Sequence, residues 1–188
     1  YLPIWSERTE GVGLASASLA EEATMREQLK LIPGVFFNPK STFKTLPSHR
    51  LYILAWIAPL YFGIARVFRP PTYGRAIQFF GSPVLLFLFV ILVGIIIIPL
   101  SAWIMCQILK LFRKRLSVKK LMNIGGYALV PRLVVAIIGY IILAISPGVF
   151  YQKHLTPALV ALIILGAVGI LYTLFLFFYG IIISPSEE

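Results

Sequence analysis

The sequence of 188 residues contains no aspartate, and its seven glutamates all lie within the first 27 residues or the last two. No carboxylate side chain therefore occurs between Gln28 and Ser186. Carboxylates carry most proton relays and cation sites in membrane proteins, and they take part in most acid–base hydrolysis. We therefore expect no catalytic residues and predict that the protein is not an enzyme.

Cysteine and histidine are scarce as well. Cys106 is the single cysteine, which excludes a disulfide within one chain, and its apolar surroundings indicate a small core residue. His49 and His154 have no cysteine or acidic neighbour, and the chain has no glycine-rich phosphate loop followed by Lys-Ser/Thr. We therefore expect no metal site and no cofactor.

Charged residues make up 13% of the chain and hydrophobic ones 59%, with a mean hydropathy of +0.90. Soluble proteins average about 25% charged residues, so this composition predicts an integral membrane protein. The formal net charge of +10 resides on basic residues that separate apolar stretches. Their expected counterions are anionic phospholipids, and we expect no nucleic acid partner because no binding motif accompanies the charge.

The longest apolar stretch runs from Pro83 to Leu109 and contains 27 residues without a charge. About 20 apolar residues suffice to cross a bilayer. Residues 110–120 follow at once and hold six basic residues. Because Lys and Arg are enriched in cytoplasmic loops, we place this basic segment in the cytoplasm. Its basic side chains are predicted to contact lipid or a partner: Lys110, Arg113, Lys114, Arg115, Lys119 and Lys120.

Three further stretches are apolar, so we predict an all-α, polytopic membrane bundle of four transmembrane helices. We expect Pro59 and Pro99 to kink the first two spans and Pro131 to break the third. Small residues are expected where helices touch, at Gly94, Gly139, Gly166 and Gly169. The transmembrane region is 51–183, with spans at about 51–67, 83–109, 121–145 and 156–183, and a tail follows at 184–188.

Residues 1–32 form an extramembrane segment before the bundle. We expect a short helix in it, from a capping box at Ser18 and Glu21 to a stop at Pro33. This helix either packs on its own loops or docks a partner. Its apolar face carries Met25, Leu29 and Ile32.

Residues 33–50 form an interfacial amphipathic segment. Asn38 is a suitable cap for a helix from Pro39 to Leu46, because proline fits the first helical position. We expect Phe43 to reach the acyl chains, while Lys40 and Lys44 reach the lipid phosphates.

The distribution of basic residues predicts the orientation of the four spans. Twelve basic residues belong to the N-terminal segment, the segment 110–120 and the C-terminal tail, and four belong to the connections on the other side. This bias predicts that the N-terminus, the segment 110–120 and the C-terminus are all cytoplasmic.

Apart from Arg66 at the end of the first span, Arg132 is the only charged residue inside a predicted span. If the third helix began at Leu121, Arg132 would lie about 18 Å along its axis, which is an expensive depth for a charge. One explanation is that the stretch 121–130 does not belong to the transmembrane helix. Otherwise Arg132 snorkels or binds lipid, meets the acidic residue of a partner subunit, or holds a transported anion.

Two stretches resemble the Yip-domain family of multi-pass membrane proteins, in its bacterial-type branch: LIPGVFFNPKSTFKTL before the first span and SVKKLMNIGGYALVPRLVVAIIGYIIL after the basic segment. Bacterial members similarly place an aromatic, Asn/Asp-Pro, Thr/Ala-Phe stretch before the first helix. They also place Gly/Tyr-Ala, and then proline, in the third. The resemblance covers residues 29–183.

The resemblance implies a bundle without known enzymatic activity, located in the bacterial inner membrane. It implies an accessory, scaffold or assembly subunit of a larger membrane complex, such as an ABC-type exporter, with other membrane subunits as partners. The family usually has five spans where we count four, so either the chain stops before a fifth helix or another protein fills that place. Two alternatives stay open: a small transporter or channel for an anionic solute, and a trafficking adaptor like the eukaryotic members, which are associated with small GTPases.

Overall fold

The computed structural model describes residues 25–67, 72–145 and 157–186, and every regular element in these ranges is a helix. Residues 25–37 form the first helix. The others are α2 (Pro39–Thr45), α3 (Leu54–Val67), α4 (Thr72–Phe80), α5 (Pro83–Leu111), α6 (Val118–Ala128), α7 (Val130–Ile145) and α8 (Pro157–Ile183). The expected all-helical fold is therefore confirmed.

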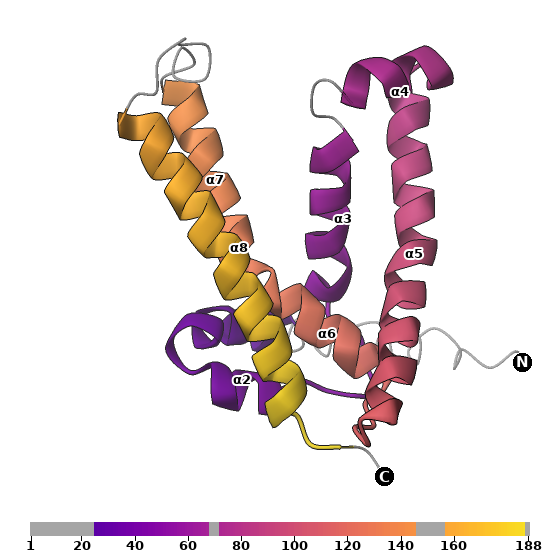
Figure 1. Ribbon diagram of the computed structural model, residues 1–188, viewed down its shortest axis with the longest axis vertical. Helices are drawn as coiled ribbons and strands as arrows, with labels where there is room; N and C mark the ends of the chain where they lie inside the picture. The colour runs from indigo at the N-terminus through magenta and orange to yellow at the C-terminus, as the bar shows by residue number, and fades with distance from the viewer. Residues whose placement is uncertain (1–24, 68–71, 146–156, 187–188) are drawn as a thin grey trace, which may run out of the picture.

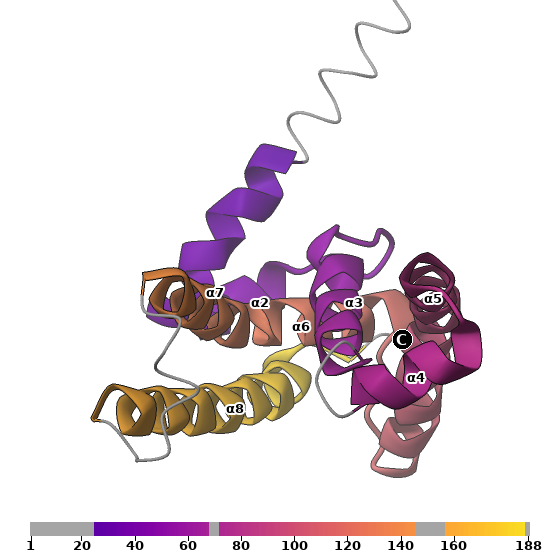
Figure 2. The ribbon, with the colours of Figure 1, turned by 90° about the horizontal axis from the view of Figure 1, so that it is seen from above.

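The long helices form two pairs that diverge from one end of the molecule (Figure 1). α3 packs on α5, and α7 packs on α8. α6 lies obliquely across the end where the pairs meet and contacts α3, α5 and α8, while α2 packs on α8. The two pairs are thus joined mainly through α6, and they are also separate in the view along the long axis (Figure 2).

The first helix differs from the sequence prediction at its C-terminal end. It continues through Pro33 to residue 37, and the Asn38 N–H donates to the Gly34 carbonyl at 2.8 Å. Proline removes a single helical donor, and the bonds of the following turn offset that loss. The proposed capping box at Ser18 and Glu21 lies outside the described residues.

The predicted start of α2 is confirmed. Asn38 caps the helix by accepting a hydrogen bond from the Ser41 N–H at 3.2 Å, and Pro39 occupies the first turn. α2 ends at Thr45, one residue before the predicted Leu46.

Among the described residues, three of the four predicted spans correspond to helices long and apolar enough to cross a membrane: Pro83–Leu111, Val118–Ile142 and Val160–Ile183. The first predicted span is a shorter apolar helix, because α3 has only 14 residues. At 1.5 Å per residue it is about 21 Å long, compared with a hydrocarbon thickness of about 30 Å. α3 and α5 continue as single helices through Pro59 and Pro99.

The predicted break in the third span is confirmed. α6 ends at Ala128 and α7 begins at Val130, just before Pro131. Pro131 has no N–H and cannot donate to the carbonyl of Tyr127, four residues back, so the helical bonding is interrupted around Leu129. The two halves differ in environment. Eight of the eleven residues of α6 are buried, so the first half of this span is protein core rather than a lipid-facing helix.

Glycines allow the closest helix approaches. A Cβ atom on Gly126 of α6 would lie 2.5 Å from the Leu54 carbonyl oxygen and 2.6 Å from the Ala55 nitrogen. Of the glycines expected at helix contacts, Gly94 meets Leu60, and a Cβ on Gly169 would lie 3.2 Å from Val135. Gly139 and Gly166 face open space, so for these two the prediction was wrong.

Candidate functional site

Asn123, on α6, is fully buried and has three hydrogen bonds to one backbone segment. Its Oδ1 accepts from the Tyr52 N–H at 2.9 Å, and its Nδ2 donates to the carbonyls of Pro47 at 3.0 Å and Arg50 at 2.9 Å. The segment 46–53 contains no helix, so its backbone groups need partners from elsewhere. One amide side chain therefore fixes the turn that starts α3.

A second set of hydrogen bonds ties the first helix to the same place. The Tyr127 hydroxyl donates to the Gln28 carbonyl at 3.1 Å, and the Gln28 Oε1 accepts from the Ile53 N–H at 3.0 Å. The Tyr52 hydroxyl, just before α3, donates to Glu27 at 3.1 Å. Burial, reinforced by this bond and by the charge of Glu27, raises the pKa of Tyr52 to about 12, so Tyr52 stays a hydrogen-bond donor at neutral pH.

Lys120 is 4% exposed, which contradicts its prediction as a lipid or partner contact. Its Nζ donates to the Leu46 carbonyl and, at 3.4 Å, to the Lys44 carbonyl. These carbonyls lie at the C-terminal end of α2, where helical acceptors lack partners and the helix dipole is negative. Lys120 therefore caps the C-terminal end of α2.

Two more lysines of the basic segment also contact the chain's own carbonyls. The Lys114 Nζ donates to the Ser184 carbonyl and, at 3.2 Å, to the Ile182 carbonyl, which caps the end of α8. The Lys119 Nζ donates to the His49 carbonyl at 3.0 Å and stays exposed. We name the hydrogen-bonded end formed by residues 27–28, 44–53, 114–127 and 182–184 the polar platform.

The remaining basic side chains of the segment stay available to lipid or a partner. Arg113 and Arg115 are exposed, as is Lys110, whose Nζ donates to the Gln107 side chain at 3.1 Å. Contact of these three residues with lipid or a partner remains a prediction.

Substitution of the adjacent Lys119 and Lys120 tests whether Lys120 caps α2. Lys120→Ala should lower the free energy of unfolding by about 2 kcal/mol, because it leaves the buried Leu46 carbonyl without a donor. Lys119→Ala should cost less than about 0.5 kcal/mol, since its bond lies at an exposed position. Thermal unfolding in detergent measures both, and equal shifts would contradict the capping role.

Phe43 is completely buried, so its predicted contact with acyl chains is wrong. It packs where α2 crosses α8, and a Cβ atom on Gly180 would lie 3.0 Å from its ring. The absent side chain of Gly180 is what makes room for Phe43 between the two helices. The exposed aromatics beside α2 are instead Phe36 (38% exposed) and Phe37 (88%). Lys40 and Lys44 are exposed as predicted, and their contact with lipid stays a prediction.

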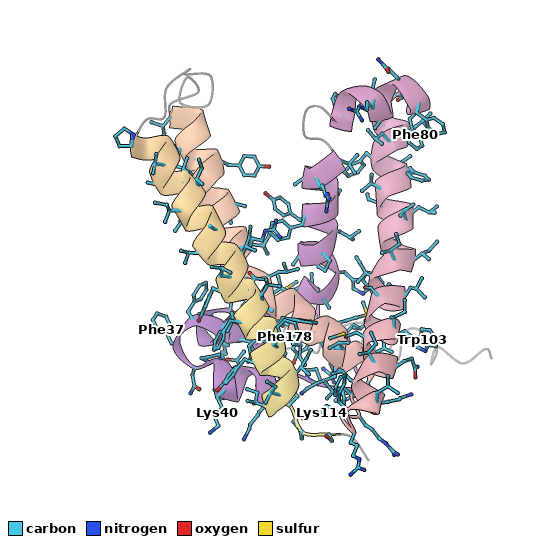
Figure 3. The ribbon with its side chains drawn as sticks, viewed as in Figure 1. Phe37, Lys40, Phe80, Trp103, Lys114 and Phe178 are labelled. Carbon is cyan, nitrogen blue, oxygen red and sulfur yellow. The ribbon has the colours of Figure 1, made fainter. Side chains whose placement is uncertain are left out.

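Aromatic and basic residues follow one another along the long axis (Figure 3). Phe37, Phe178 and Trp103 lie at a similar level, Lys40 and Lys114 lie further toward the platform end, and Phe80 lies near the opposite end. Aromatic side chains of this kind mark membrane interfaces. Trp103 lies 20 residues after Pro83 in α5, a rise of about 30 Å, which equals the hydrocarbon thickness.

Arg132 lies in the first turn of α7, beside a cavity of about 530 Å³ between α3 and α7. We name this the arginine cavity. The Arg132 Cζ lies 4.4 Å from the centre of the Phe62 ring, a cation–π contact. Arg132 was predicted from the sequence to contact lipid or a partner, whereas no role was predicted for Arg66 or Asn123. The lack of any carboxylate between Gln28 and Ser186 could have indicated an anion site at the arginines. The single amide in an apolar run could have indicated a buried hydrogen-bonding role. The cavity is lined by Phe62, Gly63, Ala65, Arg66 and Arg132.

Apolar helices long enough to cross a bilayer, with exposed aromatic and basic residues at one end, define an integral multi-pass membrane protein. The chain belongs to the Yip1 domain family. The family model matches residues 34–184. The match includes all helices from α2 to α8. Comparison with curated proteins and with solved structures gave no match. The resemblance noted in the sequence is thereby confirmed at the level of the family.

Proposed function

We propose that this membrane protein is a non-catalytic accessory, scaffold or assembly subunit of a larger membrane complex, for example an ABC-type exporter. The observation that carries the proposal is the helix of residues 25–37, which extends away from the other helices (indigo in Figure 2). Its 13 residues reach about 20 Å at 1.5 Å per residue. The polar platform holds one part of this helix, through Glu27 and Gln28.

The same helix presents an apolar stripe. Met25 is 48% exposed, Leu29 57% and Phe36 38%, and the spacing of these residues places them on one helical face. Ile32 lies on this face too but packs against the core, so the stripe is continuous with the bundle. An apolar stripe on a helix that the polar platform holds in place is suited to bind an apolar groove of another subunit.

We further propose four spans, α3 being the first, in a bacterial inner membrane with the N-terminus and the segment 110–120 cytoplasmic. The twelve-to-four distribution of basic residues supports this orientation. The levels of the aromatic and basic residues in Figure 3 support the same membrane boundary at the platform end. α4 follows α3 in the chain and packs on both α3 and α5.

Site-specific photocrosslinking in native membranes tests the subunit proposal. A photoreactive side chain at Leu29 should crosslink one membrane protein, whereas the same group at the adjacent Lys30, also exposed but off the stripe, should crosslink far less. Crosslinking of Leu29 to lipid alone would instead make this helix a membrane anchor and overturn the proposal.

The second candidate is a small transporter or channel for an anionic solute, which the arginine cavity favours. Substrate-dependent anion flux by the purified chain in liposomes, abolished by Arg132→Ala, would establish it in place of the subunit function. We do not favour the trafficking-adaptor alternative.

A further inference from the structure

The arginine cavity brings two cations together without an acidic residue to pair with them. Arg66, in the last turn of α3, and Arg132, in the first turn of α7, both line it. The sequence offers no carboxylate between Gln28 and Ser186. Among the described residues, the one specific contact of either guanidinium is that of Arg132 with Phe62. A cation–π contact supplies no hydrogen-bond acceptor, so the N–H donors of both groups still need acceptors.

The register of α3 against α5 gives the depth of the two arginines. Leu60 of α3 packs against Gly94 of α5, and the two helices run antiparallel. At 1.5 Å per residue, Arg66 lies level with a point on α5 about 8 Å from Pro83. Phe62, with Arg132 beside it, lies level with a point about 14 Å from Pro83. If α5 enters the hydrocarbon near Pro83, both charges lie inside the hydrocarbon, at the end opposite the basic segment 110–120.

The short length of α3 explains how a polar group reaches this depth. α3 is about 9 Å shorter than the hydrocarbon is thick, and a short helix draws headgroups and water inward. Arg66 marks the end of α3 where this happens. The cavity extends from there to Arg132, and its volume of about 530 Å³ lies in the range of small-molecule sites.

We propose that the arginine cavity binds a phosphate group through Arg66 and Arg132, and that this phosphate belongs to a lipid of the leaflet opposite the basic segment. Guanidinium groups match phosphate oxygens with paired N–H donors. A phosphate monoester carries a charge of about −1.5 to −2 at neutral pH, which balances two arginines, whereas a diester balances one. The cavity should therefore prefer a lipid with a terminal phosphate monoester, such as phosphatidic acid, over phosphatidylglycerol. Phosphatidylcholine, whose headgroup carries no net charge, should bind least.

Native mass spectrometry of the full chain, with defined lipids added to detergent micelles, tests the proposal. Phosphatidic acid should bind the wild type at least tenfold more tightly than phosphatidylcholine, with phosphatidylglycerol between them. Arg66→Gln and Arg132→Gln should each weaken the binding of phosphatidic acid tenfold or more. Arg75→Gln is the matched control, because Arg75 is an exposed arginine of α4 that does not line the cavity, and it should leave binding unchanged.

Three outcomes would overturn the proposal. The first is equal binding of phosphatidic acid by the wild type and both cavity variants, with melting temperatures showing that all are folded. The second is tight binding of inorganic phosphate that depends on both arginines, without enrichment of any phospholipid, which would assign the cavity to a soluble anion. The third is loss of a co-purifying protein in Arg132→Gln with lipid binding unchanged, which would assign Arg132 to a partner's acidic residue. The proposal is independent of the crosslinking test at Leu29, so either can fail alone.

Discussion

Replacement of Asn123 by leucine is expected to cost more than about 3 kcal/mol of stability, enough to remove much of the folded protein. Leucine has a similar volume but leaves the Tyr52 N–H and the carbonyls of Pro47 and Arg50 without their partner. Each buried backbone group left unpaired costs about 1–3 kcal/mol. The total stability of a domain is about 5–15 kcal/mol.

Fluorescence-detected size-exclusion chromatography after heating measures this loss. Gln107→Leu is the matched control, because it makes the same change from amide to leucine on the partly exposed side chain that accepts from Lys110. It should shift the melting temperature by little. A folded Asn123→Leu variant with the melting temperature of the wild type would show that water or a rearranged segment 46–53 replaces the amide.

The second large effect is expected at Gly126, where alanine should lower stability by about 3 kcal/mol, the upper end of the usual cost of overpacking. Its Cβ would lie 2.5–2.6 Å from backbone atoms of Leu54 and Ala55. A flexible side chain could turn away, but the backbone at the start of α3 is held by Asn123 and can move only if α3 separates from α6.

The neighbouring Gly125→Ala is the control for this substitution. A Cβ atom there meets the Phe177 ring at 3.8 Å, which is ordinary contact, and alanine has the higher helix propensity. Gly125→Ala should therefore be neutral or slightly stabilising. Equal melting temperatures for the two variants in detergent would contradict the close approach of α6 to α3.

Local signals predicted much of this fold. The cap at Asn38, the apolar stretch after Ser82 and the break at Pro131 each depend on residues within a few positions of one another. The length of α3 was predicted less well, because Leu51 to Ile53 are as apolar as the helix that follows. Their backbone is held instead by Gln28 and Asn123, which lie far away in the sequence.

The predictions for the site failed where a distant partner decides the role of a side chain. Lys120 and Phe43 have the residue types of an interfacial surface, yet the first binds the end of α2 and the second packs against α8. A sequence shows that a lysine is charged, but it does not show which helix end lacks a donor. Arg66 and Arg132 are similarly 66 positions apart in the sequence, and only the fold places both beside one cavity.

The bonds of the polar platform also set an order of events during synthesis. The acceptor of the Tyr52 N–H, Asn123, comes 71 residues later in the chain. The donor to the Gln28 carbonyl, Tyr127, comes 99 residues later. The donor to the Phe43 carbonyl, the Ser184 hydroxyl at 3.5 Å, comes 141 residues later. Ribosomes add about 5–20 residues per second, so Tyr52 is synthesised about 4–14 s before Asn123. Water or the insertion machinery must solvate the backbone before α3 during that interval. The platform can close only after the last turn of α8 has been made.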